Sequence, residues 1–479
     1  MNISIVGGGT AGWIAAYFIC KDQPGKHNIT VIESSKIGII GAGEGSTGTM
    51  LDLLNGSFFP FKIDINSFLK DVDGTLKMGI YHQNWSGDGS GYFAPLDASP
   101  TMFNYNDYIF KHVLSKYGKD KMHVSSMIGF QFENKNYSQP HAFHFDGHKV
   151  GQFFKKLCEK DGVKVIDAVV KDVITDNGTV KQLVLDNNDI ITSDFFIDCT
   201  GFSRILMKKL GVNWTSYQEY LPVNTAMPFL LDYEENEEII PMTTATALDA
   251  GWMWTIPLTT RKGCGYVFDS NYITKEQAQL EVETYLGKKI KPIKFIHFDS
   301  GTSEKFWKRN VLCLGLSSAF VEPLEATSIH STIIQLLIFV KEYLHNNIED
   351  TLCQENQDLY NEKISKLFES FIDFISFHYQ GGRHDTLFWK DIQNKNKCTP
   401  RAKKYYAKCK TKISSFLEIN GIIGSPAAGL WNWIAAGLNI ITPGQAKLEL
   451  DNSNLTDIAD SDYQRFIEQQ STRKYITYL

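Results

Sequence analysis

A glycine-rich turn near the start of the chain constrains its fold more than any other feature. Gly7–Gly12 has the spacing GxGxxG and lies between an apolar segment, Asn2–Val6, and a segment of helical periodicity from Ala11 to about Lys21. In a strand–turn–helix unit these glycines permit the tight turn, let the backbone approach a pyrophosphate, and allow helix and strand to pack closely. The next apolar segment, Asn28–Glu33, ends on an acid at the spacing that suits a ribose hydroxyl. The sequence therefore predicts an α/β fold with a dinucleotide site, whose contacts are Gly7, Gly9, Thr10, Ala11, Gly12 and Glu33.

Composition excludes several other classes of protein. The chain has 479 residues, 43% of them apolar and 21% charged, which is enough for a large buried core and more than one domain. A formal net charge of −6 argues against nucleic acid as the main partner. None of the eight cysteines forms a CxxC pair, so we expect reduced thiols in a cytoplasmic protein, without metal or disulfides. We expect neither a signal peptide nor a membrane span, since no basic region precedes the first strand and the apolar run Ile333–Val340 is short.

Alternation, apolar runs and turn residues predict further elements. We expect helices over Lys149–Lys160 and from near Thr327, strands over Val163–Val173, Val180–Leu185, Phe195–Asp198 and Val311–Gly315, and sheet segments over Met227–Tyr233 and Ala250–Asp269. Asn177–Gly178 is a turn signal, and the composition of Asp88–Pro100 indicates an irregular surface loop. Lysine and aromatic residues cluster beyond about Lys397, so the predicted organisation is a core over residues 1–396 and a helical module over 397–479.

Two apolar segments that end in glycine favour FAD over NAD as the dinucleotide. Phe195–Gly201 resembles the second nucleotide contact of flavin monooxygenases, and Asn310–Gly315 resembles their late element beside the ribityl chain. Gly315 is therefore a further predicted cofactor contact, although Leu316 stands where many flavoproteins have aspartate. The predicted fold is a Rossmann-like FAD-binding fold of the flavin monooxygenase type, with interleaved β-sheet and the C-terminal helical module. The sequence indicates no NAD(P)H site.

The most distinctive segment is Trp252-Met253-Trp254-Thr255-Ile256-Pro257, which resembles the WxWxIP motif of the flavin-dependent tryptophan halogenases. Other segments resemble motifs of that family in the same order along the chain: Gly41–Thr47, Asp73–Gly79, Ala142–Asp146, Phe320–Thr327, His378-Tyr379 and Trp389. The resemblance runs from about residue 2 to residue 390. The preserved order makes chance agreement a poor explanation.

The resemblance implies a reaction and a set of site residues. Reduced FAD, supplied by a separate flavin reductase, would react with O2 and a halide ion to give hypohalous acid, which reaches Lys77 and then an electron-rich aromatic carbon. Lys77 would polarise or carry the electrophilic halogen, and Glu325 would stabilise the cationic intermediate and accept its proton. The resemblance also implies FAD contacts at Gly43, Glu44 and Ser46, halide contacts at Thr327 and Ser328, and a wall between flavin and substrate made by Trp252, Trp254, Ile256 and Pro257.

Each of these assignments has a plainer alternative. Most lysines are solvated, so Lys77 taken alone is a surface residue. Glu325 suits the start of a helix, where the dipole favours an acid, and Glu322 is a rival carboxylate. Trp252 and Trp254 are two residues apart on a predicted strand, so they share a face as core residues.

Two departures from the family pattern concern the halide. Ala326 stands where serine is usual, and Ser328 stands where glycine is usual. The first change removes a hydroxyl near the oxidant, and the second adds a side chain near the halide. Because heavier halides are also easier to oxidise, we expect bromide or iodide to work at least as well as chloride.

The expected substrate is an indole, a phenol or another small electron-rich aromatic. Phe93, Trp431 and Trp433 are weak candidates for stacking on it, with ordinary packing as the alternative. The expected partners are this substrate, the reductase and the halide, with no nucleic acid and no membrane, and a homo-oligomer is left open. The rival functions are an FAD-dependent monooxygenase that hydroxylates an aromatic substrate and a non-catalytic flavoprotein. Lys77 and Glu325 argue against both rivals.

Overall fold

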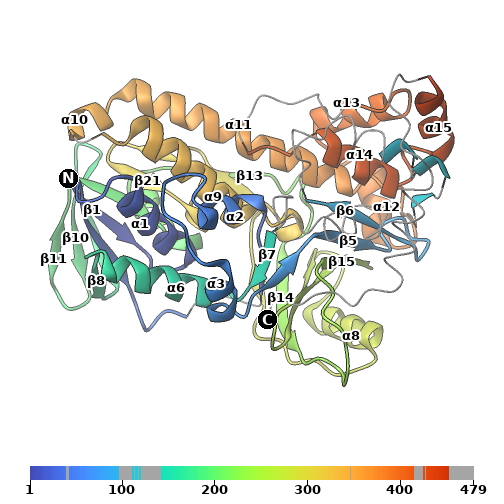
Figure 1. Ribbon diagram of the computed structural model, residues 1–479, viewed down its shortest axis with the longest axis horizontal. Helices are drawn as coiled ribbons and strands as arrows, with labels where there is room; N and C mark the ends of the chain where they lie inside the picture. Colours follow the sequence, from blue (N-terminus) through green and yellow to red (C-terminus); the bar gives the residue numbers. More distant parts are fainter. Residues whose placement is uncertain are drawn as a thin grey trace. The chain divides into compact units, whose positions relative to one another are not determined.

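The computed structural model describes residues 1–38, 43–96, 110–112, 114–116, 118–119, 142–345, 347–414, 424–426 and 428–452. Contacts divide the chain into two compact units, each built from three stretches of sequence. The first unit holds Met1–Gly74, Phe145–Tyr217 and Asp299–Glu369, and the second holds Thr75–His144, Gln218–Phe298 and Ser370–Leu479. The helices and strands of each unit are drawn in Figure 1.

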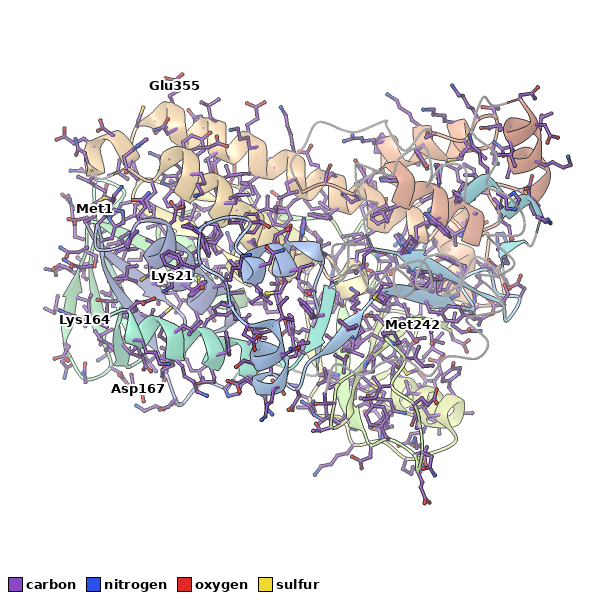
Figure 2. All side chains as sticks on the ribbon, viewed as in Figure 1. Met1, Lys21, Lys164, Asp167, Met242 and Glu355 are labelled. Carbon is purple, nitrogen blue, oxygen red and sulfur yellow. The ribbon has the colours of Figure 1, made fainter. Side chains whose placement is uncertain are left out.

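The first unit is built on a six-stranded sheet with the strand order β20-β21-β12-β1-β2-β8. Its strands are parallel except for β20, as the alternation of strands and helices along this part of the chain requires. Their bounds are β1 (Asn2–Val6), β2 (Asn28–Glu33), β8 (Lys164–Asp167), β12 (Phe195–Asp198), β20 (Trp307–Lys308) and β21 (Val311–Cys313). Figure 2 labels Lys164 and Asp167, the two ends of β8.

Helix α1 (Thr10–Asp22) begins directly after the glycine turn and packs against α6 (Gly147–Lys160). Its residues from Gly12 to Ile19 are all buried, which suits a central helix that is apolar on every side. The unit's other elements are β3 (Glu44–Gly45), α2 (Gly48–Asn55), α3 (Ile65–Asp71), β9 (Val170–Asp176), β10 (Thr179–Leu185), β11 (Ile190–Thr192), η3 (Gly201–Ser203), α7 (Ile205–Lys209), β13 (Trp214–Ser216), β19 (Gly301–Ser303), η4 (Gly315–Ser317), β22 (Ala319–Phe320), η5 (Pro323–Glu325), α9 (Thr327–Ile338), η6 (Phe339–Tyr343) and α10 (Ile348–Thr351). Helix α11 (Gln354–His378) begins in the first unit and ends in the second.

The second unit is built on a seven-stranded sheet with the order β18-β14-β17-β16-β15-β5-β6. Neighbouring strands are antiparallel except β15 and β5. Helix α8 (Lys275–Leu286) starts with a capping box at Thr274 and packs on β17. The strands are β4 (Thr75–Lys77), β5 (Gly79–Gln83), β6 (Gly91–Pro95), β14 (Thr225–Leu231), β15 (Thr243–Leu248), β16 (Gly251–Pro257), β17 (Lys262–Phe268) and β18 (Ile296–His297). Strand β7 (Ala142–Phe145) has its last residue in the first unit and the others in the second. The remaining helices are α12 (Leu387–Asn394), α13 (Pro400–Cys409), α14 (Ala428–Gly437) and α15 (Pro443–Asp451).

Two of the expected elements are wrong. The segment 88–100 is not one irregular loop, because Gly91–Pro95 forms strand β6, which pairs with β5 and is mostly buried. Tertiary pairing has overridden the turn-rich composition there. The single strand expected over residues 163–173 is two strands, β8 and β9, which belong to different sheets. The turn expected at Asn177–Gly178 is confirmed, since both residues have positive φ and join β9 to β10.

The segment from residue 397 onward is helical in α13, α14 and α15 and belongs to the second unit. The division of the chain at residues 396 and 397 stays a prediction. No helix among the described residues is both long and apolar enough to cross a bilayer. All eight cysteines are free thiols, and five of them are buried.

Candidate active site

The glycine turn at the start of α1 is closed toward the protein and open on its other side. Gly7 has a φ of +111°, and a Cβ there would lie 2.2 Å from the Cys199 carbonyl oxygen. A Cβ on Gly12 would lie 2.0 Å from the Gly7 carbonyl oxygen, whereas a Cβ on Gly9 would meet no atom within 4 Å. The turn therefore packs tightly around Gly7 and Gly12, while Gly9 faces open space.

The first helical bond of α1 runs from the Trp13 amide to the Gly9 carbonyl over 3.1 Å. The amides of Thr10, Ala11 and Gly12 precede that bond, and such amides at a helix start suit an anion. The open side at Gly9 and this helix start together fit the pyrophosphate of a dinucleotide. The side chains play a different part: the Thr10 hydroxyl donates to the Gly147 carbonyl at 2.8 Å, and the methyl group of Ala11 lies against Gly315. Thr10 and Ala11 thus offer their backbones to a ligand.

Glu33 is held in place by two side chains of the same unit. One carboxylate oxygen pairs with Nζ of Lys155 at 2.5 Å, and the other accepts a hydrogen bond from the Trp13 indole at 3.1 Å. A Cβ on Gly8 would lie 2.0 Å from Glu33 Oε2, so glycine at that position makes room for the acid. The sequence predicted Glu33 but missed Gly8, Trp13 and Lys155, whose roles depend on contacts across the fold.

Two other predicted contacts belong to tight turns in the same unit. Gly43 has a φ of +88° and Gly315 a φ of +59°, values that favour glycine. Ser46 is buried, and burial together with the charge of Asp146 raises the pKa of Glu44 to about 7. A carboxyl group with such a pKa exchanges a proton near neutrality, which is a property found at functional sites. Gly41, in the same glycine-rich segment, lies outside the described residues.

Asp198, at the end of β12, organises two turns that border this region. Its carboxylate accepts hydrogen bonds from the backbone amides of Thr200, Leu206 and Met207, at 2.9 to 3.1 Å, and from the hydroxyls of Thr200 and Ser317. The side chain is fully buried, so these five donors are what make its charge tolerable. The sequence placed Asp198 in a nucleotide-contact segment, but its structural role was missed. The only available signal was an acid that ends an apolar strand.

The segment with Glu325 is also in the first unit. Pro323–Glu325 forms one turn of 3-10 helix, η5. Ala326 follows with a φ of +54°, and α9 begins at Thr327. Glu325 is half-buried and precedes the first residue of the helix, whereas Glu322 is fully buried. The amides of Thr327 and Ser328 lie in the first turn of α9, where an anion is favoured.

Lys77 lies in the second unit and is only 1% exposed, which rules out the alternative of a solvated surface lysine. Lys77 is the last residue of strand β4, which pairs with β7 so that Thr75 lies opposite His144 and Lys77 opposite Ala142. Burial, with the Lys77 charge adding to it, lowers the pKa of His144 well below its ordinary value. Burial also lowers the pKa of His82, with smaller contributions from His378 and Lys77. Lys77 is thus a buried amine near two imidazoles that are neutral at pH 7.

The WxWxIP segment forms strand β16 of the second unit. Trp252 is buried and Trp254 half-buried, and their rings lie 6.3 Å apart on one face of the strand. Gly265 on β17 leaves room for Trp254, because a Cβ there would lie 2.1 Å from its ring. Ile256 and Pro257 are buried further along the strand. These residues belong to the core of the sheet, and a role as a wall stays a prediction.

The three weak candidates for substrate stacking are all packed within the second unit. Phe93 is buried with Met78. Trp431 packs against Phe374, Phe377 and Tyr405, and Trp433 against Phe110. Ordinary core packing accounts for these contacts.

Comparisons with known proteins agree with this geometry. The family model described as tryptophan halogenase matches residues 2–447. The 7-chloro-L-tryptophan 6-halogenase KtzR of Kutzneria sp. (strain 744) is 31% identical over 438 residues, which are 82% of this chain and 81% of that protein. The tryptophan 6-halogenase SttH of Streptomyces toxytricini is 31% identical over 436 residues, with the same coverage of both chains.

Solved structures show the same fold. The tryptophan halogenase from Shewanella frigidimarina NCIMB 400 superposes with a TM-score of 0.84 at 25% identity, covering 98% of this chain and 95% of that one. The flavin-dependent halogenase Xcc4156 from Xanthomonas campestris gives a TM-score of 0.82 at 25% identity, covering 98% and 93%. The expected Rossmann-like, FAD-binding type of fold is confirmed. The chain therefore belongs to the tryptophan halogenase family and is a flavin-dependent halogenase, an FADH2-dependent oxidoreductase.

Proposed function

We propose that this enzyme uses FADH2 from a separate reductase, O2 and a halide ion to halogenate a small electron-rich aromatic molecule through hypohalous acid. The observation that carries the proposal is the burial of Lys77, which is 1% exposed. Burying an amine is costly, and buried ionisable groups are concentrated at functional sites. Bound reduced flavin would supply the electrons that activate O2, and Gly9, the start of α1, Glu33 and Gly315 would hold it.

Lys77 is proposed to receive the electrophilic halogen and present it to the substrate. It would do so as a hydrogen-bond donor to hypohalous acid or as an amine that forms a haloamine. Neutral His82 and His144 nearby add no positive charge of their own, so the site can accept a small polar oxidant. We assign Glu325 to the stabilisation of the cationic ring intermediate and to the removal of its proton.

The halide is proposed to bind at the amides of Thr327 and Ser328. Its preference is proposed to include bromide and iodide, because Ala326 offers no hydroxyl and Ser328 adds a side chain at the helix start. Trp252, Trp254, Ile256 and Pro257 are proposed to keep the organic substrate away from the flavin, so that halide is oxidised in its place.

An indole is the proposed substrate class. KtzR and SttH are named for tryptophan substrates, which supports an indole ring. We propose a site less selective than that of an enzyme dedicated to free tryptophan, in keeping with the expected range of small electron-rich aromatics. Phe93, Trp431 and Trp433 are kept as proposed pocket residues, in addition to the packing contacts described above.

The test supplies the enzyme with a flavin reductase, NADH, FAD and one halide at a time, and follows products by mass spectrometry. The substrates are L-tryptophan, simple indoles and phenols. Halide-dependent products on several indoles support the proposal, whereas a strong preference for free L-tryptophan contradicts the looser site. Hydroxylated products without halide dependence would identify a monooxygenase in place of a halogenase.

A further inference from the structure

A hydrogen-bonded network of the second unit surrounds the strand that carries Lys77. Thr75 and Lys77 are two residues apart on β4, so their side chains project from the same face. Thr75 lies opposite His144 in the antiparallel pair of β4 with β7, which places the imidazole on that face as well. His144 is 0% exposed.

Two hydrogen bonds hold this imidazole, and a third joins its partner Thr75 to a further strand. The Thr75 hydroxyl donates to the Pro257 carbonyl at 2.6 Å, where Pro257 is the last residue of the WxWxIP segment. His144 Nδ1 lies 3.2 Å from the Thr75 hydroxyl oxygen. His144 Nε2 lies 2.8 Å from the hydroxyl oxygen of Thr243, the first residue of β15. The network therefore connects β4 and β7 to β15 and β16.

The positions of the protons follow from counting donors. A carbonyl oxygen cannot donate, so the 2.6 Å contact with Pro257 uses the single hydroxyl proton of Thr75. The Thr75 oxygen must then accept from His144, which puts a proton on Nδ1. In a neutral ring Nε2 is left as an acceptor, and the Thr243 hydroxyl donates to it. Burial favours the neutral ring by lowering the pKa of His144, and the Lys77 charge acts in the same direction, while a backbone hydrogen bond at Leu76, the smallest of the three effects, raises this pKa.

We propose that Thr75 and His144 are positioning residues for Lys77. His144, as a neutral imidazole protonated on Nδ1, and Thr75 fix strand β4 against β15 and against the Pro257 carbonyl. They thereby fix the backbone position of Lys77, from which its side chain extends to the amine. The inference rests on the proposed role of Lys77 in the reaction.

Such a device is useful because lysine has a long, flexible side chain. Productive transfer of a halogen needs the amine held in place to within a fraction of an ångström, and small displacements are costly to the rate. A displaced Lys77 would let oxidant escape before it meets the substrate. The expected signature is less product for each NADH consumed, with flavin oxidation continuing.

The first experiment reads the tautomer directly in the full-length protein. Histidine-selective 15N labelling and NMR at pH 7 report which ring nitrogen carries the proton. The His144 signal is assigned as the one that shifts in both Thr75→Ser and Thr243→Ser, two variants that keep a hydroxyl. The result expected is a neutral ring protonated on Nδ1, with Nε2 as the acceptor. A ring protonated on Nε2 alone, or on both nitrogens, would overturn the inference.

The second experiment compares Thr75→Val with Thr75→Ser. Valine keeps the shape and removes both hydrogen bonds, so product per NADH should fall about tenfold, while serine should restore it. The kcat for product should fall without a matching change in KM. Equal product yield in the two variants would overturn the positioning role. If the Lys77→Ala variant halogenates normally, the proposed function of Lys77 is wrong. The NMR result does not depend on that function and tests the hydrogen-bond network alone.

Discussion

The Glu33 carboxylate is oriented by Lys155, whose Nζ lies 2.5 Å from it, while the Trp13 indole donates to its other oxygen. The acid expected to bind a ribose hydroxyl thus has its position set by α1 and α6. Removing the lysine should let the carboxylate turn away and should change the electrostatics of the site.

We expect Glu33→Gln to weaken FAD binding about tenfold and Lys155→Met to weaken it less, about threefold, since one charge-assisted bond is lost in each case. Titration of FAD followed by its fluorescence measures both. Lys156→Met, an exposed neighbour on the same helix, serves as the control. Equal affinities for the two lysine variants would show that Lys155 does not orient the acid.

The glycine turn allows a paired test of the cofactor site. Gly9→Ala should fold like the wild type, because its Cβ meets nothing within 4 Å, but should lose at least about tenfold in FAD affinity by obstructing the pyrophosphate. Gly12→Ala should be less stable by about 3 kcal/mol, because its Cβ would lie 2.0 Å from a carbonyl oxygen. Urea unfolding and FAD titration separate the two effects. Wild-type FAD affinity in Gly9→Ala would place the pyrophosphate elsewhere.

Glu44 should make stability depend on pH near neutrality. Its pKa rises from 4.5 to about 7 on folding, because burial and Asp146 disfavour the charged form. A raised pKa stabilises the fold fully below pH 4.5, and this stabilisation is lost as the pH rises through 7. Glu44→Gln cannot ionise, so its stability relative to the wild type should increase by about 2 kcal/mol between pH 5 and pH 8.

Urea unfolding of the FAD-free protein at the two pH values measures this change. Glu159→Gln, at an exposed position on α6, is the control and should show no such dependence. A constant difference between Glu44→Gln and the wild type would mean that Glu44 ionises normally in the fold.

Halide selection should respond to the two residues that depart from the family pattern. In Ala326→Ser with Ser328→Gly, the ratio of chlorinated to brominated product should rise about fivefold, the effect of one hydrogen bond near the oxidant. Competition assays at equal halide concentrations give this ratio. Dominant chlorination by the wild type would contradict the proposed preference, whatever the double variant does.

Local patterns predicted the parts of this molecule that are built from contiguous sequence. The strand, glycine turn, helix and acid from Asn2 to Glu33 are where the spacing put them. Strand β6 was missed because it forms a strand through its pairing with β5. The break between β8 and β9 was missed because the two strands join different sheets.

The candidate site shows the same division between local and distant information. The motifs named Lys77, but its burial belongs to the folded chain, in which β4 pairs with β7 from a distant stretch of sequence. The hydrogen bonds among Thr75, His144, Thr243 and Pro257 bring together four separate stretches, so no spacing within one motif could reveal them.

The central claim is that Lys77 transfers the halogen, and one comparison tests it most directly. Lys77→Ala is assayed with reductase, NADH, FAD, bromide and an indole, and brominated product and flavin oxidation are measured in the same reaction. Lys70→Ala, at an exposed lysine of α3, is the control. We predict that Lys77→Ala loses at least about 99% of the product while flavin oxidation continues, as loss of a group needed in the transition state requires. Normal bromination by Lys77→Ala would contradict the account.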